Sequence, residues 1–223
     1  MLGLPKTTEF NKRIPKQKFY EKMAVTPAIK KVFAEQIKMI YWRNKIAATT
    51  VNLAAGEKVS ELQVFEILLN QPSLDEAALL QIDRALPYHV LFILTHEGKQ
   101  QAWIAYKEAQ QSGNAFKIVQ YYHTDWKETE TLHLYFEGQS VDAVYENYVR
   151  QIAGQNIIAD SHDLKNDVTH SKEIHALQKQ IETLQERIRK EKQFNRQVEM
   201  NAEVKKLLEH FQNWITLYEV NLM

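Results

Sequence analysis

The sequence predicts an α+β protein, with an antiparallel sheet and flanking helices, followed by a C-terminal α-helical hairpin or coiled coil. Three observations lead to this fold class. Residues 89–136 contain short apolar runs separated by turn residues, a pattern typical of an antiparallel meander. Amphipathic helical patterns stand before and after those runs. Beyond residue 170, apolar residues recur at alternating spacings of three and four, which is the repeat of paired helices.

The composition divides the chain into four sections. At 223 residues, with a hydrophobic fraction of 44%, the chain is long and apolar enough to bury a core. Gly3, Pro5 and Pro15 lie among the first lysines, so we expect that section to be extended. The predicted sections are a basic N-terminal arm, an α+β globular domain, a linker and a C-terminal helical or coiled-coil region, at residues 1–24, 25–155, 156–170 and 171–223.

The globular domain is predicted to begin with an amphipathic helix. Thr26 is suited to the N-cap and Pro27 to the first helical position. The apolar residues that share one face of this helix are Ile29, Val32, Phe33, Ile37 and Ile40. We therefore expect the helix to run to about Tyr41.

A short strand and a second helix follow. The apolar run at residues 64–69 has the length of a strand. Ser73 and Glu76 have the spacing of a capping box, so we expect a helix that continues to Leu86. Pro87 ends that helix because it cannot continue the backbone hydrogen bonding.

The predicted meander has four strands, at residues 89–95, 101–106, 116–122 and 131–136. Residues 97–99, with Gly98 at their centre, form a tight polar turn between the first two strands. Ser140 then caps a helix whose apolar residues share one face as far as Ile152. The body is therefore expected to combine an antiparallel sheet with flanking helices.

The C-terminal section is predicted to carry a surface for a protein partner. Its apolar seam consists of Ile174, Leu177, Ile181, Leu184 and Ile188. A later stripe, which includes Phe211, Trp214 and Tyr218, continues towards the terminus and needs a cover. Phe194, inside a basic stretch, completes the partner-binding candidates. The seam can pair within the chain as a hairpin, with a second copy as a homodimer, or with another protein.

The formal net charge is zero, but the charges are unevenly distributed. Residues 1–45 contain eleven Lys and Arg against three acids, whereas residues 46–160 contain seven against fifteen. Such asymmetry indicates contact with a polyanion, or docking of the basic section on the acidic domain of the same chain. The nucleic-acid-binding candidates are Lys12, Arg13, Lys16, Lys18, Arg43, Arg187, Arg189, Lys190, Lys192 and Arg196.

Several function classes lack their motifs in this sequence. It contains no phosphate-binding glycine loop, no dinucleotide-binding glycine turn, no HExxH pair and no Gly-x-Ser-x-Gly. We therefore expect no catalytic or metal-binding residues and no cofactor. Cysteine is absent, which removes disulfides and thiolate metal sites. No apolar run reaches the roughly 18 residues of a membrane span, so we expect a cytoplasmic protein without a membrane partner.

One catalytic alternative remains open, a metal-dependent nuclease. Glu97 and Lys99, or Asp125 and Lys127, match the acid-x-lysine pair of such enzymes, and Glu66 could supply the distant acid. In this chemistry the carboxylates hold Mg²⁺, which activates the attacking water. Glu97 and Lys99 are equally suited to a hairpin turn, and a motif of this length counts only in its structural context.

Six separated segments carry a resemblance to a known family: Met1–Lys6, Asn11–Lys16, Ile40–Ile46, Asn52–Gly56, Asp142–Asn147 and Lys190–Val198. In this order they span essentially the whole chain, which resembles the bacterial and archaeal family catalogued as domain of unknown function 4391. Its members are encoded beside helicases and adenine-specific DNA methyltransferases, in islands typical of restriction or phage-defence systems. The resemblance implies a non-enzymatic accessory subunit that binds a helicase or methyltransferase subunit and, weakly, DNA.

Overall fold

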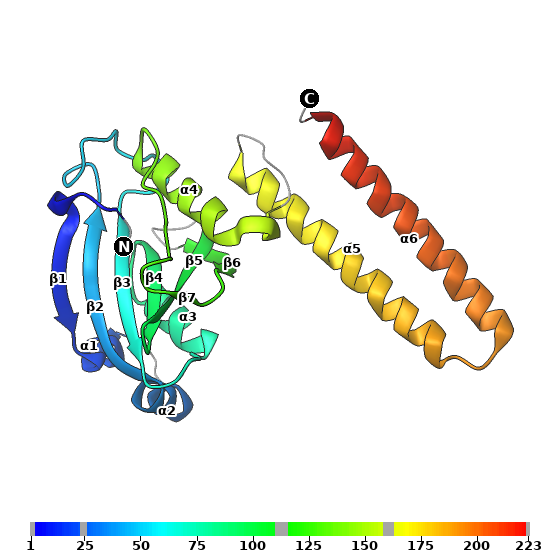
Figure 1. Cartoon of the computed structure of the whole chain (residues 1–223), viewed down its shortest axis with the longest axis horizontal. Coiled ribbons are helices and arrows are strands. Elements are labelled where there is room, and N and C mark those ends of the chain that lie inside the picture. Colours follow the sequence, from blue (N-terminus) through cyan, green and yellow to red (C-terminus); the bar gives the residue numbers. More distant parts are fainter. Residues whose placement is uncertain (1–2, 23–25, 110–115, 158–162, 222–223) are drawn as a thin grey trace. The chain divides into compact units, whose positions relative to one another are not determined.

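The computed structural model of the chain describes residues 3–22, 26–109, 116–157 and 163–221, with the side chains of the last helix described as far as Gln212. The chain divides into two compact units between Gly154 and Gln155. The first unit is a sheet with helices, and the second is a pair of long helices (Figure 1). This confirms the predicted class, an α+β body followed by a helical pair.

The first unit is built on a sheet that has seven strands within the described residues. The strands are β1 (Glu9–Ile14), β2 (Ile37–Ile46), β3 (Leu62–Leu69), β4 (His89–His96), β5 (Lys99–Ala109), β6 (Phe116–His123) and β7 (Lys127–Glu128). Strands β1 to β6 lie side by side in chain order, and the short β7 pairs with β5. Strands β3 and β4 are parallel, and helix α3 (Glu76–Arg84) forms the crossover that such a pair requires. The other strand pairs are antiparallel, as predicted.

Three helices cover one face of this sheet. Helices α1 (Lys16–Lys22) and α2 (Pro27–Glu35) join α3 there, and Phe19, Phe33 and Leu79 are their buried contributions to one core. Alternate residues of the strands, among them Phe65 and Phe92, complete that core. Burial of these side chains is the main force that holds the helices on the sheet.

Helix α4 (Val141–Ala153) packs against β5 and β6 and is fixed at its N-terminus by a carboxylate. Asp142 accepts hydrogen bonds from the backbone N–H groups of Glu57, at 2.8 Å, and Val59, at 2.6 Å. A Cβ atom on Gly56 would lie 2.3 Å from the carbonyl oxygen of Val59, so this turn requires glycine. Two of the segments that carry the family resemblance, at 52–56 and 142–147, therefore meet in the fold.

The second unit is an antiparallel pair formed by α5 (Leu164–Lys190) and α6 (Phe194–Asn221), as Figure 1 shows. Ile181 and Leu184 from α5 are buried against Val204 from α6. Leu177, Ile188, Leu207 and Phe211 are half-buried around them. The predicted seam is therefore closed within the chain, as a hairpin.

The first predicted helix is shorter than expected. Helix α2 ends at Glu35 instead of Tyr41, and β2 begins at Ile37. The segment from Ile37 to Ile46 is rich in β-branched and aromatic residues, which favour a strand. A bulge between Ile37 and Met39 lets both Ile37 and Ile40 reach the core from a strand. The helical spacing of these two isoleucines was therefore misleading.

Two predicted sections contain more secondary structure than the sequence suggests. The basic N-terminal arm, 1–24, is not simply extended, because it contains β1 and α1 and β1 pairs with β2. The expected linker, 156–170, is partly helical, since α5 begins at Leu164. Within that linker, residues 158–162 lie outside the described residues. Proline and glycine residues suggested an extended arm and a linker, but the same residues also occur between short strands and helices that are packed.

Two further details differ from the prediction. Residues 131–136 form no strand, although Leu132 and Leu134 are buried and so produce the alternating pattern. Helix α3 has Asp75 as its N-cap instead of Ser73, and the Asp75 carboxylate accepts a backbone N–H of the first turn. By contrast, the turn between β4 and β5 forms where the sequence predicts it.

Candidate functional site

A polar groove lies on the sheet face opposite α1, α2 and α3. It has a volume of about 520 Å³ and lies over β1 to β5, and its lining residues include Gly3, Leu4, Asn44, Val64 and Ile93. Alternation along the strands places these positions on the face that does not contribute to the core beneath the three helices. The groove therefore exposes part of the sheet to solvent.

A chain of hydrogen bonds crosses five strands beside this groove. Gln100 donates to Thr95 at 3.3 Å, and Thr95 donates to one carboxylate oxygen of Glu66 at 3.0 Å. Arg43 donates through Nε to the other oxygen of Glu66 at 2.7 Å and through Nη1 to Asn11 at 3.3 Å. Each of these residues comes from a different strand, so the register of the whole sheet sets the geometry of this network.

Arg43 and Glu66 form the central ion pair of the network, and their opposite charges largely cancel. The side chain of Glu66 is 13% exposed and that of Arg43 is 39% exposed. The Arg43 guanidinium also lies over the ring of Tyr41, 4.5 Å from its centroid. Both oxygens of Glu66 thus accept hydrogen bonds from the protein, and the groove floor is polar without a strong net charge.

Glu66, Glu97 and Lys99 of the nuclease alternative take structural positions, whereas Asp125 and Lys127 are exposed, Lys127 at the start of β7. Glu66 is held by Arg43 and Thr95. Glu97 is exposed in the β4–β5 turn, with a positive φ of 44°, and Lys99 begins β5 beside Glu128 of β7. Among the described residues, no group of three His, Cys, Asp or Glu side chains is arranged to hold a metal ion.

A second cluster of titratable groups is buried inside the first unit. Lys107 donates to Asp83 at 2.6 Å and to the carbonyl of Tyr88 at 2.8 Å, and Tyr121 donates to the other oxygen of Asp83 at 2.8 Å. Burial raises the pKa of Asp83, and the charge and hydrogen bond of Lys107 oppose that rise. Because the groups satisfy one another, the cluster fastens α3 to β5 and β6. The one sign of this cluster in the sequence is Asp83, a single acid on the apolar face of a predicted helix.

Lys16, a predicted nucleic-acid-binding residue, performs a structural task. Its ammonium group donates to the carbonyl of Phe33, at 2.7 Å, and to that of Ile37. Burial lowers the pKa of Lys16. These two carbonyls lie where α2 ends and β2 begins, so Lys16 satisfies backbone acceptors that the helix leaves open.

The other basic candidates of the N-terminal section lie at the surface. Lys12 and Arg13 are exposed on β1, and the Lys12 ammonium lies 4.4 Å from the ring centroid of Phe10. Lys18 is exposed on α1 and forms an ion pair of 3.5 Å with Glu21. Of these four candidates, Lys12, Arg13 and Lys18 are thus exposed cations, whereas Lys16 is half-buried and caps the end of α2.

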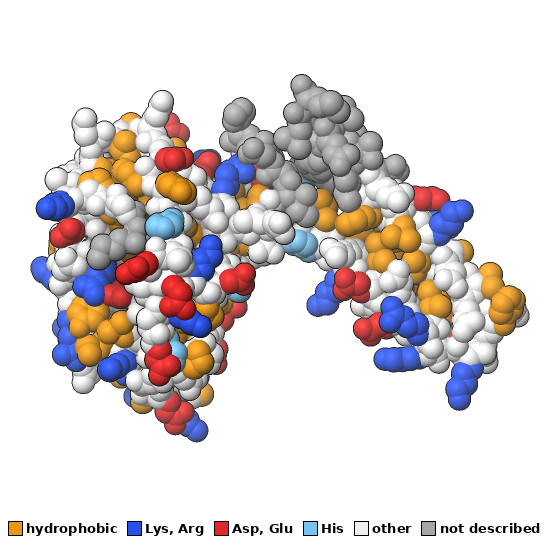
Figure 2. Space-filling model, viewed as in Figure 1, with side chains coloured by type: hydrophobic (Ala, Val, Ile, Leu, Met, Phe, Trp, Pro, Cys, Tyr) orange, Lys and Arg blue, Asp and Glu red, His pale blue; other side chains and the backbone are white. Residues whose placement is uncertain are grey.

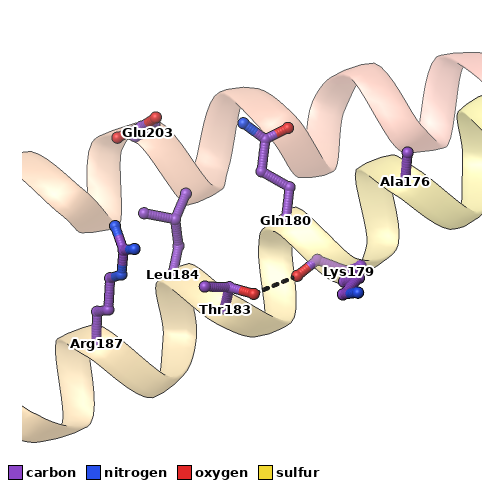
Figure 3. A pocket seen from close by; sticks show the side chains of 7 residues that line it. All are labelled: Ala176, Lys179, Gln180, Thr183, Leu184, Arg187 and Glu203. Atoms are coloured by element: carbon purple, nitrogen blue, oxygen red, sulfur yellow. Dashed lines mark hydrogen bonds between the residues drawn. The ribbon is translucent and has the colours of Figure 1, made fainter.

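The hairpin carries a groove of about 490 Å³ between its helices, and Figure 3 shows the residues that line it. Leu184 and Arg187 extend from α5 towards α6, on which Glu203 lies near Arg187 (Figure 3). Thr183 donates to the carbonyl of Lys179 within α5 at 2.8 Å. Arg187 is therefore directed partly towards the neighbouring helix.

The end of the hairpin that contains the α5–α6 turn exposes both charge and apolar surface. The cations Arg189, Lys190, Lys192 and Arg196 are all exposed. Phe194 is 74% exposed and Val198, one turn further along α6, is 51% exposed. Leu208, 38% exposed, lies farther from the turn on the same helix. Figure 2 shows hydrophobic side chains and Lys or Arg side chains together at that end of the hairpin.

The partner-binding candidates consequently fall into two groups. Leu177, Ile181, Leu184, Ile188 and Phe211 pack within the hairpin, and Ile174 is buried. Phe194 is exposed at the turn. Trp214 and Tyr218 belong to α6, but their side chains lie outside the described residues. Leu208 belongs to the later apolar stripe of the sequence and Val198 ends the segment 190–198, but neither was among the predicted partner-binding residues.

Comparison with known proteins gave one match. Residues 2–210 match a family model described as a domain of unknown function, DUF4391. No curated protein and no solved structure matched the chain. Within the described residues, the helices are too short or too polar to be candidates for crossing a membrane.

Proposed function

The chain belongs to the DUF4391 family, and from that premise we propose that it is a non-enzymatic accessory subunit of a helicase- or methyltransferase-associated phage-defence or DNA-processing assembly. In this proposal the hairpin binds a protein subunit, and exposed cations add weak affinity for DNA. Such a subunit acts in the cytoplasm, where its partner meets DNA. The family resemblance suggests the kind of assembly, and the surface of the hairpin suggests the role.

One observation carries this proposal: the hairpin exposes apolar side chains although its own seam is closed. Val198 and Leu208 are 51% and 38% exposed, while Ile181, Leu184 and Val204 are buried between the helices. The two exposed residues lie ten positions apart on α6, roughly 15 Å along the helix axis. Apolar side chains kept in water along a rigid helix are typical of a contact surface.

Contacts inside the protein also support this proposal over the alternatives. A homodimer that pairs through the seam would have to open the hairpin, because Ile181 and Leu184 already pack on Val204. The nuclease alternative depends on Glu66, whose two oxygens are engaged by Arg43 and Thr95. These contacts favour an interaction protein over both rivals.

A pull-down from the native host tests the proposal. The tagged protein is recovered at moderate salt after nuclease treatment, so that contacts bridged by DNA are removed, and its companions are identified by mass spectrometry. We expect a helicase or methyltransferase subunit in stoichiometric amount. The double variant V198D/L208D should lose that companion, because each substitution places a charge in the apolar contact.

A matched control is available in the first unit. Tyr135 is another large exposed side chain, 63% exposed, and Y135S should leave recovery of the companion unchanged. Recovery of the tagged protein alone would contradict a stable assembly. Equal recovery by the wild type and V198D/L208D would contradict the assignment of the contact to α6.

A further inference from the structure

The turn of the hairpin presents an aromatic ring to solvent. Helix α5 ends at Lys190, and Phe194 is the first residue of α6. The Phe194 side chain is 74% exposed, the largest exposed fraction among the large hydrophobic residues of the described part. Most of this ring is therefore open to contact with a ligand.

The same turn gathers positive charge around that ring. Arg189, Lys190, Lys192 and Arg196 are exposed and lie within five residues of Phe194. At no more than about 3.6 Å per residue, each of their backbones lies within roughly 18 Å of the ring's own. The ring and the cations can therefore reach a single ligand together.

The acidic residues of the turn do not cancel this charge. Residues 186–199 contain five Lys and Arg and three Glu. The carboxylate of Glu191 accepts the backbone N–H groups of Gln193 at 2.9 Å and Lys192 at 2.8 Å, and these hydrogen bonds, with a smaller contribution from the charge of Arg196, lower its pKa. Glu191 thus binds the backbone just before α6. The turn remains basic because its Lys and Arg residues outnumber its Glu residues.

We propose that this turn binds single-stranded DNA, with Phe194 stacked on a base and Arg189, Lys190, Lys192 and Arg196 in contact with phosphates. Single strands offer both a flat base and a phosphate backbone, and proteins bind them with an aromatic ring among cations. A duplex hides its bases in the stack and would use only the cations. The inference rests on the DNA affinity in the proposed function and names the form of DNA.

Fluorescence anisotropy with the purified full-length protein tests the inference. The probes are a labelled single-stranded oligonucleotide of about 20 nucleotides and the same sequence as a duplex. We expect tighter binding to the single strand. F194A should weaken that binding about five-fold or more, because stacking on one base is lost, with an unchanged salt dependence. The control Y135A removes an exposed aromatic ring from the first unit, 63% exposed, and should change the affinity less than two-fold.

Two further variants separate stacking from charge. F194W should restore binding, and its added tryptophan emission should be quenched by the stacked base. R189E/K190E should reduce the slope of log affinity against log salt by about 1.4, because two phosphate contacts are lost and each contributes about 0.7 on a single strand. Equal affinity for single strand and duplex, or unchanged binding by F194A, would overturn the inference.

The outcome is independent of the proposed protein contact. A purified protein that binds no DNA but recovers its subunit in the pull-down would refute this inference and leave the subunit role intact. A protein that binds the single strand through Phe194 but recovers no subunit would support this inference and refute the subunit role.

Discussion

The imidazole of His89 packs against two aromatic rings, those of Phe116 and Tyr145, inside the first unit. Burial, with a smaller contribution from the charge of Lys107, lowers the pKa of His89 from 6.5 to about 3. His89 is therefore neutral in the folded protein at pH values where a histidine in the unfolded chain already carries a proton.

We predict that the free energy of unfolding falls by about 2 kcal/mol through this residue between pH 6.5 and 4.5. The folded pKa is depressed, so the stabilisation is complete above pH 6.5 and is lost as the pH falls towards 3. Urea unfolding followed by circular dichroism measures it. H89F keeps an aromatic ring and should show a smaller loss over this range.

The exposed His133 provides the control for that experiment. H133F should lose as much stability on acidification as the wild type, because His133 is exposed in the folded chain. If H89F retains the full pH dependence of the wild type, the loss must originate elsewhere.

At the scale of elements, a short seam holds two long helices. Helices α5 and α6 contain 27 and 28 residues, and their joint core has Ile181, Leu184 and Val204 as its buried members. Isolated helices are marginally stable in water, so most of the stability of this pair comes from packing. The hairpin should therefore depend on single seam residues.

I181D should destabilise the hairpin and leave the sheet of the first unit intact, because it buries a charge in the seam. Hydrogen exchange followed by mass spectrometry is the measurement, with faster exchange expected in α5 and α6 and unchanged protection in β3 and β4. K179D, at an exposed position on the same helix, is the control. Unchanged exchange in α6 would show that the seam does not support it.

The sequence predicted those elements whose pattern has only one interpretation. Helix α4 has Ser140 as its N-cap as expected, and the seam of α5 keeps its spacing of three and four over several turns. Strand β2 was missed because Ile37 and Ile40 also fit a helix, and the bulge that lets a strand bury both has no sequence signature. Local pattern therefore sufficed for long amphipathic helices but not for an irregular strand.

The groove network could not be predicted, for a related reason. Arg43 and Glu66 meet because β2 and β3 pair in one particular register, and Thr95 joins them through β4. No spacing along the chain encodes that meeting. The basic cluster near residue 190 was visible, since its residues are neighbours in the sequence as well as in space.

At the scale of the whole molecule, the charge asymmetry of the sequence disappears within the units. Residues 1–154, the first unit, contain 18 Lys and Arg and 17 Asp and Glu. Contacts between neighbouring strands show how this happens: Arg43 pairs with Glu66, and Lys45 pairs with Glu61 at 2.7 Å. The positive charge of the N-terminal section is thus balanced within the first unit as a whole, while Lys12, Arg13 and Lys18 stay exposed, and contact with a polyanion stays a prediction.

We predict that the purified protein is a monomer at micromolar concentration, since the seam that could form a coiled-coil dimer is closed within the chain. Light scattering coupled to size exclusion measures the mass directly, and one copy corresponds to 26.2 kDa. A dimer that I181D converts to monomer would contradict this prediction, because the seam would then be the dimer interface.

Strand β1 is an edge strand of the sheet, and β2 is its partner among the described strands. A terminal strand of this kind is a template on which another chain can add its own strand. Here Lys12 and Arg13 place like charges along it, Asn11 interrupts its regularity with a positive φ of 46°, and Pro15 follows its last residue. Charge, irregularity and proline at such a border discourage intermolecular pairing. The cations of β1 thus have a use that needs no nucleic acid, which is to keep crowded copies of the protein from joining their sheets into aggregates.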